Sequence, residues 1–102
     1  MSSTPKPFAG NFVVWPGSHL THEKYFREHG RDAWHAGQPY LYYAHSVQLL
    51  LEPGEAVLCH YLLAHAAAEN TSDVDRIAAY FRIAARGDRW EQLTNLWSGW
   101  KF

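Results

Sequence analysis

The chain has 102 residues, of which 47% are hydrophobic and 16% aromatic, and it carries nine Lys and Arg against ten Asp and Glu. This length suits one domain or part of one, and so much apolar surface excludes wholesale disorder. A net charge of −1 without a basic stretch argues against nucleic acid or a membrane surface as a partner. The sequence shows neither a bilayer-spanning run nor a secretory signal, and therefore predicts a cytoplasmic protein.

The first half of the chain changes from an extended to a helical pattern. Residues 1–9 are polar with two prolines and are expected to form a flexible lead-in. Residues 11–15 are β-branched and aromatic and end at a Pro-Gly pair, which predicts a short strand. Residues 20–29 show a helical pattern that is expected to end at Gly30. Residues 31–39 lack periodicity, which predicts a loop.

The second half is richer in strand patterns. Residues 45–51 and 55–61 are separated by Pro53-Gly54, a composition typical of two antiparallel strands joined by a tight turn. Residues 76–85 alternate with a period of two and are predicted to form a third strand, although their alanines also permit a helix. Residues 90–102 place Leu and Trp at helical spacing, which predicts a helix with an apolar face at the end of the chain.

Short strands joined by turns, with helices at the edges, predict a mainly β fold of the jelly-roll kind. Four or five strands make only about half of an eight-stranded roll, and half a roll leaves open strand edges. We therefore expect the chain either to pair with another chain or to be a piece of a larger domain.

Seven histidines invite a search for a metal site, because neutral imidazole is the commonest metal ligand in proteins. None has Asp or Glu two positions on, and no pair has the i, i+4 spacing of a two-histidine zinc motif. They are His19, His22, His29, His35, His45, His60 and His65. Spacing alone therefore gives only a weak case for metal binding.

Three segments in order resemble the phytanoyl-CoA dioxygenase family. Residues 10–19, Gly-Asn-Phe-Val-Val-Trp-Pro-Gly-Ser-His, are similar to the family's Gly-x-hydrophobic-x-x-hydrophobic-Pro-Gly-Ser-His segment. Residues 52–58 are similar to its Gly-Asp strand entry, with Glu55 in place of Asp. His65 is followed by the polar residues of the series that closes the family's active site: Asn70, Ser72 and Arg76.

The resemblance implies an Fe(II)- and 2-oxoglutarate-dependent oxygenase on a double-stranded β-helix, a cupin-like roll, of which residues 10–102 would be the C-terminal portion. It implies that His65 is an iron ligand and that Arg76, eleven positions later, holds 2-oxoglutarate. These roles suit the chemistry, because imidazole binds Fe(II) and a guanidinium grips a carboxylate with two parallel hydrogen bonds. On a strand from Arg76, Arg82 would share the same face and is the second candidate for the anion.

The sequence also departs from this family. The family's other two iron ligands lie on a His-x-Asp or His-x-Glu motif, which this sequence lacks. Ala67 stands where family members can carry a hydroxyl that helps bind 2-oxoglutarate. We therefore expect the chain to be inactive alone. It is either the C-terminal half of a longer oxygenase, which we favour, or one half of a split site, or a relative that has lost the chemistry.

Each site residue also has a plainer interpretation. His65 could be a buried histidine bonded to a carbonyl group, and Arg76 could pair with Asp73 or Asp75 at the surface. The alternative function is a non-catalytic β-sandwich module that binds a partner through its open edge or an aromatic face. For the enzyme we expect a small-molecule substrate, and for the chain either self-association or a missing N-terminal half as partner.

Overall fold

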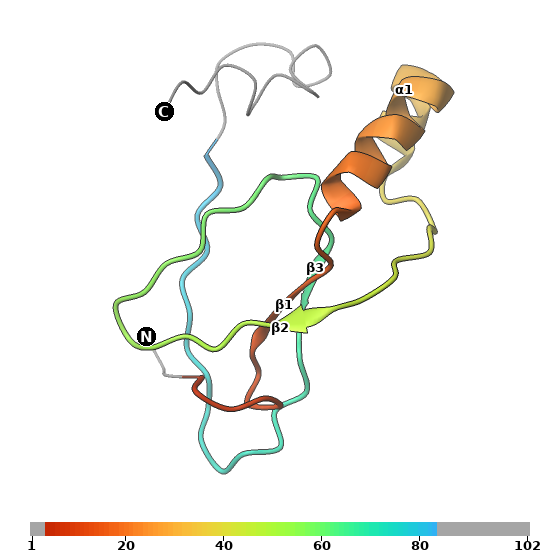
Figure 1. The fold of residues 1–102 in the computed structure, drawn as a ribbon. Helices are drawn as coiled ribbons and strands as arrows, with labels where there is room; N and C mark the ends of the chain where they lie inside the picture. Colours follow the sequence, from red (N-terminus) through yellow and green to blue (C-terminus); the bar gives the residue numbers. More distant parts are fainter. Residues whose placement is uncertain (1–3, 84–102) are drawn as a thin grey trace.

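A three-stranded antiparallel sheet lies at the centre of the chain (Figure 1). The computed structural model describes residues 4–83. Its strands are β1 (Phe12–Val14), β2 (Val47–Gln48) and β3 (His65–Ala67), in the sheet order β2-β1-β3. β1 lies within the strand predicted for residues 11–15, which confirms that prediction. Its Phe-Val-Val sequence suits a central strand, which lies between two neighbouring strands.

The helix α1 (Ser18–Ala36) follows β1 directly and includes the helix predicted for residues 20–29. It begins after Gly17, which adopts a left-handed conformation and provides no side-chain cap. Gly30 also has a positive φ of 83°, as expected for a helix-ending glycine, but the helix resumes after this kink. The loop predicted for residues 31–39 is therefore wrong over residues 31–36.

Tertiary packing explains this second helical segment. Phe26 and Leu62 form a small buried cluster, and Ala33 and Trp34 pack against it. The Trp34 ring meets the Phe26 ring edge to face, with centroids 5.0 Å apart. The packing of Ala33 and Trp34 against this cluster favours a helix over residues 31–36, where the local pattern showed no periodicity. Most helical stability in proteins comes from such packing.

The hairpin predicted for residues 45–61 is wrong in its second strand. The turn at Pro53-Gly54 is present, since the Glu55 N–H donates to the Glu52 carbonyl at 3.1 Å. β2 lies within the first predicted strand, 45–51, but it pairs with β1. Residues 55–61 form no strand, and they pair with neither of the outer strands, β2 and β3.

Two further differences concern residues of low or ambiguous strand preference. β3 contains two alanines, which sequence patterns rarely mark as strand, and its pairing with β1 overrides that preference. The strand predicted for residues 76–85 is not seen over residues 76–83. Residues 84–102, and with them the predicted C-terminal helix, lie outside the described residues.

The segment before β1 is bonded to two distant parts of the chain. The Thr4 N–H donates to the Leu51 carbonyl at 2.7 Å, and the Phe8 carbonyl accepts from the Thr71 N–H at 2.8 Å. Asn11 joins these contacts with a side chain that is completely buried (0% exposed). Its Oδ1 accepts from the Ala9 N–H at 2.9 Å, and its Nδ2 donates to the carbonyls of Thr4 and Leu49.

Replacing Asn11 by leucine is expected to destabilise the chain by about 2–4 kcal/mol, because three backbone groups around a buried site each lose a hydrogen bond. Urea unfolding should show the loss as a lower midpoint. The exposed Gln38→Ala variant is the control and should change the midpoint little. A stability loss in Asn11→Leu no larger than the control's would contradict this account of the core.

The described residues thus contain a three-stranded antiparallel sheet and one helix. This agrees with a mainly β class, while a complete jelly roll requires about eight strands. The residues described include no helix with the length and apolar character needed to cross a membrane.

Candidate functional site

His65 begins β3 with an exposed side chain, so the buried histidine of the plainer interpretation is not observed. Its Nδ1 lies 2.8 Å from the Leu63 carbonyl oxygen. A carbonyl only accepts hydrogen bonds, so Nδ1 carries the proton and donates it. The lone pair of the neutral ring is therefore on Nε2, which is the arrangement usual for metal-binding histidines.

The sheet register places His65 on the same face as Phe12. His65 pairs with Val14, and Ala67 pairs with Phe12. Residues directly opposite each other in an antiparallel pair share a face, and so do alternate residues along a strand. The rings of Phe12 and His65 confirm this, because their centroids are 5.4 Å apart.

Arg76 reaches the same face from the other end of β1. A Cβ atom built on Gly10 would lie 3.3 Å from both Cβ and Nε of Arg76, so the arginine side chain lies directly over this glycine. Its Nη2 donates to the Tyr80 hydroxyl at 2.8 Å. The Tyr80 ring in turn contacts Phe12, with centroids 6.3 Å apart. The structure therefore brings His65 and Arg76 to opposite sides of one phenylalanine.

Asn70 and Ser72 form the turn that returns the chain from β3 to Arg76. Asn70 Oδ1 accepts from the Ser72 N–H at 3.0 Å and from its hydroxyl at 2.6 Å. Asn70 Nδ2 donates to the Val74 carbonyl at 2.8 Å, and Asn70 also forms a bridge with Ala9. These two residues of the Asn-Ser-Arg series therefore hold the loop, while Arg76 is left to face β1.

Two alternatives to Arg76 as the anion-binding residue were a surface ion pair of Arg76 and a binding role for Arg82, and the contacts support neither. Arg76 forms no ion pair with Asp73 or Asp75 within residues 4–83. Arg82 is exposed, and without a strand over residues 76–83 the alternation that would put it on Arg76's face has no structural basis. Arg76 is thus the arginine that lies against β1, whereas its binding role remains a prediction.

The described residues do not hold a complete metal site. No group of three or more His, Cys, Asp or Glu side chains within residues 4–83 lies close enough together to bind a metal ion. His65 fits the part of a single iron ligand through Nε2. One imidazole does not fix the ligand number and geometry that a usable iron site requires, so no catalytic step can be derived from these residues alone.

Two other histidines form a separate pair between α1 and the segment before β3. The ring centroids of His19 and His60 are 5.6 Å apart, and the Leu62 N–H donates to His60 Nδ1 at 3.1 Å. Burial lowers the pKa of His60, and nearby His19 lowers it further, while Glu23 acts in the opposite direction. His60 is therefore held neutral in the folded chain.

This pair predicts a loss of stability in acid. Because the pKa of His60 is lowered by folding, the unfolded chain binds the proton first as the pH falls below the ordinary value of 6.5. Its contribution is complete above that pH and decreases below it, until the folded-state pKa is reached. The urea midpoint should fall less between about pH 7.5 and 5.5 in His60→Asn than in wild type. An equal fall in both, with exposed His45→Asn as control, would contradict this assignment.

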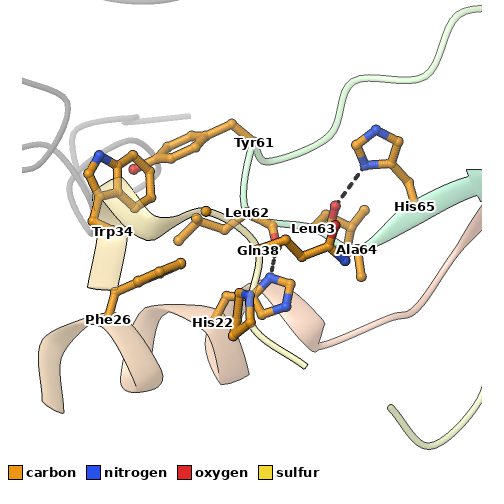
Figure 2. A pocket seen from close by; sticks show the side chains of 11 residues that line it. His22, Phe26, Trp34, Gln38, Tyr61, Leu62, Leu63, Ala64 and His65 are labelled. Carbon is orange, nitrogen blue, oxygen red and sulfur yellow. Dashed lines mark hydrogen bonds between the residues drawn. The ribbon is translucent and has the colours of Figure 1, made fainter. Parts of the chain in front are cut away.

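A cavity of about 280 Å³ lies between α1 and the residues that lead into β3 (Figure 2). Phe26, Trp34 and Tyr61 surround one end, and His65 lies at the other. Among residues 4–83, no Asp, Glu, Lys or Arg lines it. His22 lies on its wall, where Nδ1 donates to the Leu62 carbonyl and Nε2 shares a hydrogen bond with the Tyr43 hydroxyl. The cavity therefore suits an uncharged group.

Sequence reasoning missed Phe12 and Tyr80, which join the two predicted site residues. The strand parity of Phe12 was a signal that could have found it, whereas Tyr80 lies in a segment without strand structure, where alternation gives no guide.

The described residues thus form a three-stranded antiparallel sheet and one helix, and an imidazole with a free Nε2 and a guanidinium share one face of that sheet. The family model for phytanoyl-CoA dioxygenase (PhyH) matches residues 7–78 of this chain. The chain belongs to this family. No curated protein and no solved structure gives a significant match.

Proposed function

We propose that residues 10–102 are the C-terminal portion of an Fe(II)- and 2-oxoglutarate-dependent dioxygenase domain, with the double-stranded β-helix fold of its family. The observation that carries the proposal is the placement of His65 and Arg76 on the Phe12 face of β1. Family membership supports it, since the match covers both residues.

Each residue has a distinct part in this proposal. His65 provides one iron ligand through Nε2, with its ring orientation held by the bond to Leu63. Arg76 binds the carboxylate of 2-oxoglutarate that lies away from the metal. Iron and 2-oxoglutarate, when bound, supply the oxygen activation that hydroxylates a C–H bond. The chain's own residues orient the dicarboxylate and present the imidazole.

Another polypeptide segment must supply the two remaining iron ligands. A second copy of this chain does not carry the family's motif for them, because none of its seven histidines is followed two positions on by Asp or Glu. The partner is therefore a different segment that carries His-x-Asp or His-x-Glu. We propose that the chain alone is inactive and that self-association does not restore activity.

The small-molecule substrate is proposed to place an uncharged group in the cavity beside His65. A charged group would lose its hydration there without an opposite charge on the cavity wall, which is unfavourable. The aromatic end formed by Phe26, Trp34 and Tyr61 favours a flat or apolar group.

The proposal is tested by an anaerobic titration with Fe(II) and 2-oxoglutarate, read as the weak visible metal-to-ligand charge-transfer band. The chain is mixed with an N-terminal half of a phytanoyl-CoA dioxygenase family member that carries His-x-Asp. A band in the mixture, and none with either part alone, is the expected result.

Absence of the band in every mixture would instead favour a non-catalytic binding module. The feature on which such a module would rely is the aromatic surface at Tyr40 and Tyr42, whose side chains are almost completely exposed. Large exposed aromatic residues are common where proteins bind partners.

A further inference from the structure

The Arg76 guanidinium is held on two sides. On one side, its Cβ, Cδ and Nε pack over Gly10, where a Cβ atom would leave only 3.3–3.4 Å. On the other side, Nη2 donates to the Tyr80 hydroxyl at 2.8 Å, and the guanidinium carbon lies 5.9 Å from the centroid of the Tyr80 ring. A hydrogen bond and a ring contact to the same residue restrict the guanidinium more than either contact alone.

Tyr80, which is 64% exposed, touches the sheet through one side of its ring. Its ring contacts Phe12 with centroids 6.3 Å apart, and the opposite neighbour of Phe12 is His65, at 5.4 Å. One aromatic residue therefore separates the arginine's anchor from the candidate iron ligand. This chain of contacts connects the two ends of the proposed site through β1.

We infer that Tyr80 is a positioning residue that orients the Arg76 guanidinium for a carboxylate, an inference that rests on the proposed function. Arginine has five N–H donors, and Tyr80 takes only one of them. Within residues 4–83, Arg76 donates no other hydrogen bond. Both hydrogens of Nη1 and the second hydrogen of Nη2 are thus available for two parallel bonds to a carboxylate.

Gly10 has a matching role on the other side of the guanidinium. Its φ of +72° is one that L side chains rarely adopt, and any Cβ would press on the arginine side chain. The glycine that begins the Pro-Gly-Ser-His segment therefore leaves room for the arginine of a segment more than sixty residues later.

The experiment uses the metal-free full chain with arginine side-chain NMR and glutarate, the dicarboxylate without an oxo group. In wild type, the bond to Tyr80 should slow rotation of the guanidinium and give separate Nη signals, which glutarate shifts. Tyr80→Phe keeps the ring but loses the hydroxyl, so its Nη signals should average and its Kd for glutarate should rise about three- to tenfold. Tyr80→Leu loses both contacts and should bind glutarate more weakly still.

The matched control is Tyr42→Phe, which removes a hydroxyl from a tyrosine that is 88% exposed. It should bind glutarate as wild type does. Equal urea midpoints in Tyr80→Phe and wild type would separate positioning from a general loss of structure.

The inference is overturned if Tyr80→Phe binds glutarate as tightly as wild type, if the wild-type Nη signals are already averaged, or if glutarate leaves them unshifted. The charge-transfer band is read separately. A missing band with a Tyr80-dependent response would refute the dioxygenase and leave the anion site standing, whereas a band with an unchanged Tyr80→Phe would do the reverse.

Discussion

Replacing His65 by alanine is expected to abolish the charge-transfer band that Fe(II) and 2-oxoglutarate give with the completed site. The imidazole would be one of only three protein ligands, and the two that remain would leave iron weakly held. The Nδ1 bond to Leu63 already fixes the tautomer that presents Nε2, so the substitution removes a prepared ligand. The measurement is the anaerobic titration of the variant mixed with the complementing half.

The control for this prediction is His45→Ala, which removes another exposed imidazole outside the sheet. It should leave the band at its wild-type amplitude. A band that survives in His65→Ala would remove His65 from the iron site. A band lost in both variants would indicate damage to the fold, which urea unfolding of each variant would show.

Much of the centre of the fold was predictable from local sequence. The strand at residues 11–15 was recognisable because β-branched and aromatic residues end at a Pro-Gly turn. The helix that follows also has a local pattern. Family resemblance selected His65 and Arg76, which spacing alone could not separate from the other histidines and arginines.

The parts that were not predictable depend on contacts between distant residues. β3 is alanine-rich and becomes a strand only because β1 offers it an edge. Trp34 lies in a helical turn because it packs against the buried side chains of Phe26 and Leu62. Val57 and Leu58 had the composition of a strand, yet their exposed segment is irregular and joins neither edge of the sheet. Local composition indicates whether a residue favours helix or strand, whereas contacts with distant residues decide which of them forms.

Tyr80 illustrates the same limit at the site. Its spacing of four from Arg76 is visible in the sequence, but the packing of Arg76 over Gly10 is not. Such a contact joins segments that no local pattern relates. It emerges only when β1 and the chain after β3 are placed together.

Replacing Arg76 by alanine is expected to weaken 2-oxoglutarate binding roughly 10- to 100-fold in the completed site, because two charge-assisted hydrogen bonds are lost. Metal binding should remain largely intact, since the guanidinium lies on the far side of Phe12 from His65. The measurement is the 2-oxoglutarate concentration that gives half of the band, with Fe(II) in excess. Arg76→Lys should recover only part of the loss, because an ammonium group cannot form the paired contact.

Arg82→Ala is the matched control and decides between the two arginines. Arg82 is exposed and lies in a segment that is not paired with β1, so its removal should change the half-saturating concentration little. If Arg82→Ala weakens binding and Arg76→Ala does not, the anion is held by Arg82, and the packing of Arg76 over Gly10 is only structural. If both variants weaken binding by similar small factors, the two cations act through long-range charge alone. In that case the effect of each variant on binding should disappear at high salt, because salt screens exposed charges while a bidentate contact persists.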